Sequence, residues 1–207
     1  MPILDKAAWL ALAREAHGRT AFGLLGAFFA YFYTAPPLRL AARKGLGELA
    51  VGLSFGPLAV AGTVYALTGT VALADFLAGV PIGLLTVAIL WINQFPDLEA
   101  DKASGKVNLV VVLGRERARW GYVALMLAAF GLALYWSLVS GIYPLGALLI
   151  LGGAPLAYQA SRVIVNEYKE RSLVRANVAT IKLHSVAGLL MAAGILWSGA
   201  ISGLLGI

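Results

Sequence analysis

Three oxygen-bearing side chains recur at intervals of four residues at the end of a long apolar run. Asn93, Asp97 and Asp101 occupy positions i, i+4 and i+8, so on a helix they share one face. Mg²⁺ favours such oxygen ligands and is commonly held by one or two carboxylates together with substrate phosphates. The pattern therefore predicts a magnesium site. The alternative is a solvated loop whose acids pair with Lys102 and Lys106.

A second group of reactive side chains follows a pair of prolines. Pro36 and Pro37 end the helix that precedes them, and Arg39, Arg43 and Lys44 come next. Arginine binds phosphate through a bidentate fork, and lysine binds it as a point charge. Alone, the three cations indicate only membrane topology. Beside a magnesium-type site, they favour a shared diphosphate site.

The elements that carry these groups are those of a membrane protein. The chain has 207 residues, 60% hydrophobic and only 13% charged, whereas a soluble domain carries about 25% charged residues. A spanning helix needs about 20 mostly apolar residues. Five segments meet this requirement, and a sixth is short and rich in aromatic side chains. The five segments are roughly 46–68, 75–95, 118–139, 142–161 and 180–204. The short sixth segment is about 20–36.

The predicted fold is therefore all-α, a polytopic transmembrane bundle of about six spans. We expect residues 1–19 to form an amphipathic or partial N-terminal helix and residues 20–207 to form the transmembrane domain. Most of the 16 lysine and arginine residues lie in the loops 37–45, 97–119 and 162–182. The positive-inside rule places these three loops in the cytoplasm.

The remaining composition excludes several classes of function. The positive-inside rule also accounts for the net charge of +6, so we expect no nucleic-acid partner. The chain has no cysteine, which excludes disulfides and thiolate metal sites. The acidic residues gather at the cytoplasmic end of one span rather than along a span, which argues against a small membrane transporter.

Four stretches of the sequence resemble the UbiA superfamily of intramembrane aromatic prenyltransferases. They are "YTAPPLRL", "GLGELAVGLSFGPLAVAGTVYALTG", "WINQFPDLEADKASGKVNLVVVLGRERAR" and, more weakly, "ATIKLHSVAGLLMAAGILW". Their order and spacing are specific to the superfamily, and "YTAPP", "GLGE" and "FGPLAVAGT" favour its 1,4-dihydroxy-2-naphthoate polyprenyltransferase branch. The resemblance implies Mg²⁺-dependent transfer of a polyprenyl group from its diphosphate to an aromatic acceptor, in menaquinone biosynthesis, within a bacterial or archaeal cytoplasmic membrane.

The resemblance also implies roles for individual residues. Asn93, Asp97 and Asp101 match a metal-binding Asp-rich motif, with Asp97 and Asp101 as the catalytic carboxylates. The resemblance implies that Tyr33, Arg39 and Lys44 contact the diphosphate, and the nearby cations Arg43, Lys102 and Lys106 are further candidates. The sequence itself offers Glu48, Trp91 and Phe95 for the acceptor or prenyl pocket. The alternatives are that Glu48 orients Arg39 or Arg43 and that the two aromatic residues mark the membrane interface. His184 is more simply interpreted as bonded to a neighbouring helix.

The resemblance ends where the family has a first Asp-rich motif, N-D-x-x-D. The family has nine helices, whereas the six predicted spans match helices four to nine, and no acid before residue 93 falls in that pattern. Three explanations are open: a truncated sequence, a degenerate homologue, or a site completed by a partner chain. Without the first three helices, one helix face of the bundle would be uncovered, which also predicts self-association. A non-catalytic relative that binds isoprenoid lipid is the main functional alternative.

Overall fold

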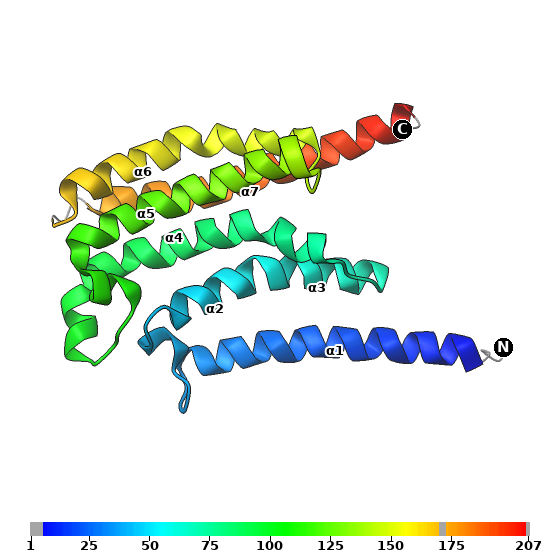
Figure 1. Ribbon diagram of the computed structural model, residues 1–207, viewed down its shortest axis with the longest axis horizontal. Coiled ribbons are helices and arrows are strands. Elements are labelled where there is room, and N and C mark those ends of the chain that lie inside the picture. The colour runs from blue at the N-terminus through cyan, green and yellow to red at the C-terminus, as the bar shows by residue number, and fades with distance from the viewer. Residues whose placement is uncertain (1–5, 170–172, 206–207) are drawn as a thin grey trace.

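The computed structural model describes residues 6–169 and 173–205, with side chains described for 16–169 and 173–204 (Figure 1). These residues form helices and connecting loops without any strand. The α-helices are α1 (Lys6–Thr34), α2 (Leu46–Phe55), α3 (Pro57–Thr68), α4 (Leu73–Ala103), α5 (Leu109–Tyr135), α6 (Ala154–Glu167) and α7 (Leu173–Leu205). Shorter helical turns are η1 (Leu40–Ala42), η2 (Trp136–Ser140) and η3 (Leu145–Gly153).

Five segments of the described chain are long and apolar enough to cross a membrane. They are Leu46–Thr68, Leu73–Ala103, Leu109–Ser140, Leu145–Glu167 and Leu173–Leu204. Each contains or closely overlaps one of the five clear spans predicted from the sequence, which confirms the all-α membrane bundle. The predicted sixth span falls within α1, which ends at Thr34 just before the proline pair. Because α1 is continuous through Arg19, the domain boundary expected there lies inside a helix.

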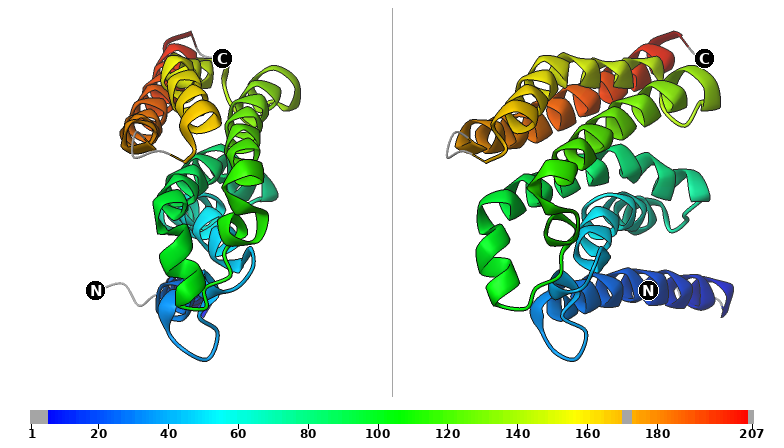
Figure 2. Two further views of the ribbon diagram at one scale, coloured as in Figure 1. Left: turned by 90° about the vertical axis from the view of Figure 1, so that its left-hand side faces the viewer. Right: turned by 60° about the vertical axis from the view of Figure 1, so that its left-hand side comes forward.

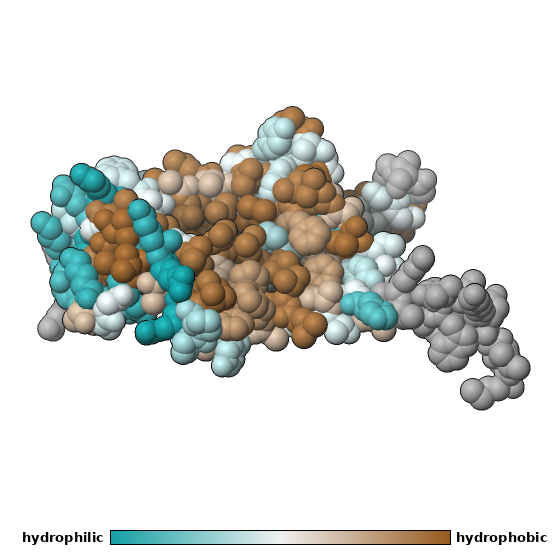
Figure 3. All heavy atoms as spheres, turned by 60° about the horizontal axis from the view of Figure 1, so that its bottom comes forward, coloured by the Kyte–Doolittle hydropathy of each residue, from teal (hydrophilic) through white to brown (hydrophobic). Residues whose placement is uncertain are grey.

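The helices follow one another across the molecule roughly in chain order (Figures 1 and 2). Helix α1 forms one edge, α2 and α3 lie beside α4, and α6 and α7 form the opposite edge. The three charged loops gather at one end, called the charged end below, where Figure 3 shows hydrophilic residues next to a broad hydrophobic surface. The fold therefore brings together both chemically interesting groups of the sequence.

Close helix crossings in this bundle depend on glycine. A Cβ atom added to Gly79 on α4 would overlap the backbone carbonyl of Gly56, where α2 meets α3. A Cβ on Gly194 of α7 would likewise overlap the carbonyl of Gly146 in η3. Small residues at such crossings let helix backbones approach closely in a membrane. These two contacts fix α4 against α2–α3 and α7 against η3.

Helix α4 supplies much of the core and also carries the acidic stripe. Leu85, Ala88, Ile92 and Phe95 are at most 1% exposed, so the middle of this helix is buried against its neighbours. Pro96 lies inside α4, yet the helix continues to Ala103. The acidic residues therefore lie on the last turns of a helix rather than in a loop, a geometry that preserves their shared face.

Candidate functional site

The stripe of Asn93, Asp97 and Asp101 lies along one face of the last turns of α4, as the four-residue spacing predicts. Asn93 and Asp97 are exposed, whereas Asp101 is only 6% exposed. The three side chains therefore share one face of the helix but differ in their exposure to solvent.

Asp101 is held on both of its carboxylate oxygens. Its Oδ1 accepts a hydrogen bond from Lys106 Nζ at 3.0 Å, and its Oδ2 accepts one from Asn108 Nδ2 at 2.7 Å. Asn108 also caps α5, because its Oδ1 accepts from Val111 N at 2.8 Å. Asp101 therefore ties the end of α4 to the start of α5. The contact with Lys106 is also the ion pair that the alternative interpretation of the acidic residues predicts.

Asp97 presents an uncommitted carboxylate. No hydrogen bond or ion pair joins it to another residue in the described part of the chain. One turn earlier, Asn93 Oδ1 accepts a hydrogen bond from Asn177 Nδ2 of α7. No cluster of three or more acidic or histidine side chains suited to a metal ion occurs among the described residues. Asp97 thus has both carboxylate oxygens open to a cation, whereas the amide oxygen of Asn93 already accepts from Asn177.

The basic loop lies beside this acidic end. Val107 N donates to Ala42 O at 3.0 Å, which joins the loop after α4 directly to the loop after α1. Arg39, Arg43 and Lys44 are all exposed, and Arg43 Nη2 donates to Pro37 O at 3.0 Å. The side chains of Arg39 and Lys44 make no hydrogen bond to the described residues. Two groups that lie far apart in the sequence thus lie at the same end of the bundle.

The other two predicted diphosphate ligands differ in their surroundings. Lys102 is exposed and lies 4.0 Å from Glu99, one turn back on α4. Tyr33 is half-buried near the end of α1, where it lines a groove of about 360 Å³ between α1 and α2. Phe29 and Phe55 form part of the apolar walls of this groove. Tyr33 thus stands where an apolar groove meets the basic loop.

Glu48 is a buried junction between three helices. It lies on α2, is 5% exposed, and its Oε1 accepts from Gln94 Nε2 of α4 at 3.0 Å. The same oxygen accepts from Leu109 N at the start of α5 at 2.9 Å. The other oxygen, Oε2, is buried and has no hydrogen-bond partner among the described residues. Glu48 therefore holds the ends of α4 and α5 in place from α2.

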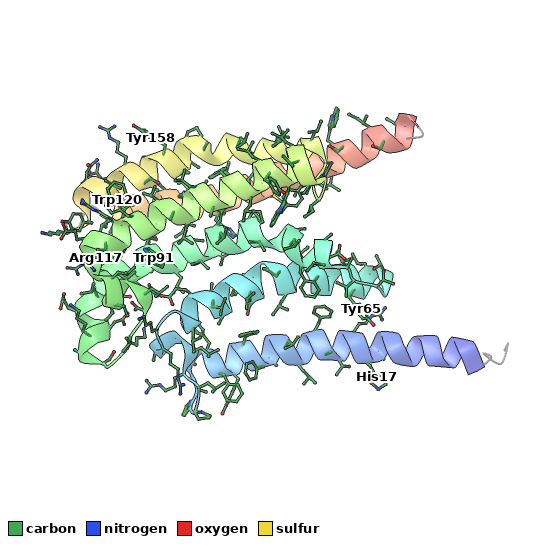
Figure 4. All side chains as sticks on the ribbon, viewed as in Figure 1. His17, Tyr65, Trp91, Arg117, Trp120 and Tyr158 are labelled. Carbon is green, nitrogen blue, oxygen red and sulfur yellow. The ribbon has the colours of Figure 1, made fainter. Side chains whose placement is uncertain are left out.

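The three candidates for an acceptor or prenyl pocket do not share one cavity. Glu48 and Trp91 line a mainly apolar hollow of about 350 Å³ bounded by α2, α4 and α5. Trp91 is 6% exposed and its Nε1 donates to Ala118 O at 2.9 Å, so it is a core residue. Phe95 is fully buried and lines a separate hollow. Figure 4 shows Trp91 on α4 near Arg117 at the charged end.

Several residues of this region gave no functional signal in the sequence. Asn177 and Gln94 are single amides within apolar helices, and only the packing of α7 and α2 against α4 gives them partners. Asn108 has a detectable signal, because asparagine before an apolar run is typical of a helix N-cap. The interpretation of His184 agrees with the structure, in which its Nε2 lies 3.0 Å from Thr86 Oγ1 on α4.

Comparison with known proteins gives one family and a consistent set of relatives. The model of the UbiA prenyltransferase family matches residues 8–186. The chain is 32% identical over 197 residues to the 2-carboxy-1,4-naphthoquinone phytyltransferase of Synechocystis sp.. It is 29% identical over 195 residues to the 1,4-dihydroxy-2-naphthoate octaprenyltransferase of Bacillus subtilis. It is 32% identical over 154 residues to the protein of that name in Escherichia coli.

These alignments cover unequal shares of the two partners. They include 92%, 92% and 74% of this chain, but 62%, 58% and 50% of the three relatives. The chain thus spans between half and two thirds of the length of the relatives it matches. No solved structure matches the chain.

Proposed function

Because the chain belongs to the UbiA prenyltransferase family, we propose that it transfers a polyprenyl group from its diphosphate to an aromatic acceptor in the membrane. The proposed acceptor is 1,4-dihydroxy-2-naphthoate, which the names of two relatives specify. One observation carries the proposal: the loop that follows the acidic end of α4 is bonded to the basic loop, from Val107 N to Ala42 O, at 3.0 Å. The oxygens suited to a metal ion and the cations suited to phosphate therefore lie at the same end of the bundle.

The donor atoms on α4 fit a magnesium ion in number and type. Asp97 offers a free carboxylate and Asn93 an amide oxygen one turn away, and Mg²⁺ needs only one or two carboxylates when substrate phosphates complete its shell. Both oxygens of Asp101 are bonded to Lys106 and Asn108. We expect Asp101 to join the ion once Lys106 turns from it toward the diphosphate. A bound Mg²⁺ would neutralise charge on the leaving group.

The basic surface would bind the substrate's diphosphate. The side chains of Arg39 and Lys44 have no competing hydrogen bonds among the described residues, and charge-assisted bonds to phosphate are the strong ones. We expect Tyr33, Arg43, Lys102 and Lys106 to complete this surface. In the reaction, the bond between the allylic carbon and the diphosphate oxygen breaks, and the electron pair leaves with the diphosphate. The aromatic ring then forms the new carbon–carbon bond and loses its proton.

Apolar walls would hold the rest of both substrates and keep water from the allylic carbon. The groove of about 360 Å³ beside Tyr33 begins next to the basic loop, which suits an isoprenoid tail whose diphosphate lies above it. The hollow of about 350 Å³ lined by Glu48 and Trp91 is the proposed acceptor pocket. Under the positive-inside rule, this surface faces the cytoplasm.

The test is prenyl transfer by this chain in membranes. The chain is supplied with labelled polyprenyl diphosphate, Mg²⁺ and 1,4-dihydroxy-2-naphthoate, and the prenylated product is measured. We expect product that disappears with EDTA and in Asp97→Asn. Glu99→Gln is the matched control, because this exposed acid lies two residues away and pairs only weakly with Lys102, at 4.0 Å. Equal activity of Asp97→Asn and the parent chain would refute the assigned metal residue.

Absence of product has two distinct meanings, which a second arm separates. The chain is co-expressed with a membrane segment that carries an N-D-x-x-D motif. Product that appears only then supports a site completed by a second segment. No product in either arm overturns the proposed catalysis and leaves a relative that binds isoprenoid lipid without turnover.

A further inference from the structure

A hollow of about 550 Å³ opens at the charged end of the helices α4–α7, and the proposed reaction does not use it. Its polar lining comes from Arg115, Tyr168, Lys169 and Asn177. Its floor is apolar and includes Phe95 of α4 and Leu173 of α7. Cations above an apolar floor, at the ends of spanning helices, are the surroundings of a lipid headgroup.

The hollow adjoins the acidic stripe at one point, because Asn177 lines the hollow and donates to Asn93 Oδ1, but Asp97 does not line it. Phe95 lines the hollow, whereas Asp97 lies about 200° further around the helix, at ~100° per residue. Asp97 therefore faces a different side of α4 from Phe95. Asp97, Tyr33, Arg39, Arg43 and Lys44 do not line the hollow, so an anion bound beside Arg115 lies outside the set assigned to the diphosphate except for Lys102, which lines an adjoining hollow.

Arg115 is held with its charged head available. Its Nε donates to Phe95 O at 3.0 Å, which fixes the side chain against α4. Its two terminal nitrogens make no hydrogen bond to any residue that the structure describes. Arg115 directly follows Gly114, whose φ of 71° interrupts α5 and starts a new helical segment. The chain thus places a fixed, half-buried guanidinium group at the mouth of the bundle.

A second hollow, of about 560 Å³, adjoins the first and extends the positive surface. It shares Arg115, Tyr168 and Lys169 with the first and adds Lys102 and Arg117. The acids that line it are Glu99 and Glu116, both exposed, so four cations face two carboxylates. Figure 4 shows Arg117 at this end of α5. The combined surface is positive and attracts an anion.

The hollow also adjoins a groove that runs along the bundle. Val174 lines both the hollow and a groove of about 290 Å³ between α6 and α7. Val174 itself is 67% exposed. The other apolar residues of that groove are Leu156, Val178 and Ala179, and its polar residues are Gln159, Arg175 and Lys182. A ligand whose phosphate lies beside Arg115 can therefore extend a hydrocarbon chain over Val174 along the outside of α6 and α7.

We propose that this hollow is a binding site for an anionic phospholipid. Arg115 and Lys169 bind the phosphate of its headgroup, and one acyl chain follows the groove past Val174. A phospholipid fits better than a soluble anion, because the cations stand on an apolar floor and the groove continues along spanning helices. The inference does not depend on the proposed prenyl transfer.

Native mass spectrometry of the whole chain in detergent tests the site. Phosphatidylglycerol and phosphatidylcholine with the same acyl chains are titrated in turn, and the bound fraction is measured. We expect tighter binding of phosphatidylglycerol, and a loss of about tenfold in Arg115→Gln, the size of one charge-assisted hydrogen bond. Lys169→Gln is the second variant. Among the described residues, its side chain makes only a ring contact with Tyr168, 5.3 Å away, so we expect folding to be preserved.

Arg162→Gln is the matched control, because it removes one exposed cation of α6 that lines neither hollow. It should leave phosphatidylglycerol binding unchanged. Equal binding of the two lipids, or equal loss in Arg162→Gln, would overturn the proposal. Competition arms use inorganic phosphate and geranyl diphosphate. Displacement of the lipid by millimolar phosphate would indicate a general anion site, and displacement by micromolar geranyl diphosphate a substrate site; each result would also overturn it.

Discussion

Replacing Glu48 by alanine should destabilise the charged end of the bundle more than any change to an exposed acid. The substitution leaves two donors without their acceptor, Gln94 Nε2 and Leu109 N. A buried donor left unsatisfied costs roughly 1–3 kcal/mol. Removing the carboxylate also relieves the burial of Oε2, which has no partner among the described residues. We expect a net loss of about 2 kcal/mol, a factor of about 30 in the folding equilibrium.

Glu48→Gln provides the chemical comparison for this prediction. The amide keeps one oxygen that can accept from Leu109 N, and its NH₂ group can donate to Gln94 Oε1, which is buried without a partner. We therefore expect Glu48→Gln to retain most of the parent stability. Glu116→Ala is the positional control, because this exposed acid makes no hydrogen bond to the described residues.

Two measurements follow the change. Reversible unfolding in SDS gives the free energy of unfolding, and hydrogen exchange gives the protection of the Leu109 amide. In Glu48→Ala, both the free energy and the Leu109 protection should fall, whereas Glu116→Ala should change neither. If Glu48→Ala and Glu116→Ala behave alike, the buried junction is not a stabilising contact and the reasoning fails. Unchanged protection of Leu109 would refute the specific hydrogen bond even if stability fell.

Two further substitutions test contacts around the same helix. Gly194→Ala should lower stability by about 1–3 kcal/mol, the usual cost of overpacking, because the new methyl group would overlap the carbonyl of Gly146. Gly188→Ala, on the same helix with open space around it, should be neutral or stabilising in the same SDS titration. Asn177→Ala removes the hydrogen bond from α7 that orients Asn93, a proposed Mg²⁺ ligand on α4. Prenyl transfer by this variant should therefore need several-fold more Mg²⁺. Asn166→Ala, which loses only a bond within α6, should keep the parent Mg²⁺ dependence, and identical titrations of the two variants would contradict the assignment.

Local pattern in the sequence was enough to predict the spans and the acidic stripe. Long apolar runs fix the positions of membrane helices, and the four-residue spacing of Asn93, Asp97 and Asp101 needs only a continuous helix to align them. The proline pair likewise marks the end of α1 at Thr34. Pro96 was the one local feature that could have broken the stripe, and α4 continues past it.

Contacts between distant segments could not be predicted in the same way. Glu48 and Leu109 are 61 positions apart, and Asn93 and Asn177 are 84 apart. Nothing in the local pattern around a single glutamate or asparagine specifies a partner on another helix. The hollow beside Arg115 depends on three separate helices and the turn after α6, so the sequence showed its cations only as part of the positive-inside pattern.

The long-range contacts change the meaning of the acidic stripe. Asp101 is bonded to Lys106 and Asn108, and Glu48 is bonded to Gln94 and the start of α5. These two acids use their oxygens to fix the frame that carries Asp97. Since Asp97 alone has no partner among the described residues, a cation or a diphosphate-bound ion reaches it without first breaking a contact. A carboxylate held free on a rigid helix end suits binding, whereas one that pairs with a neighbouring lysine must first be released.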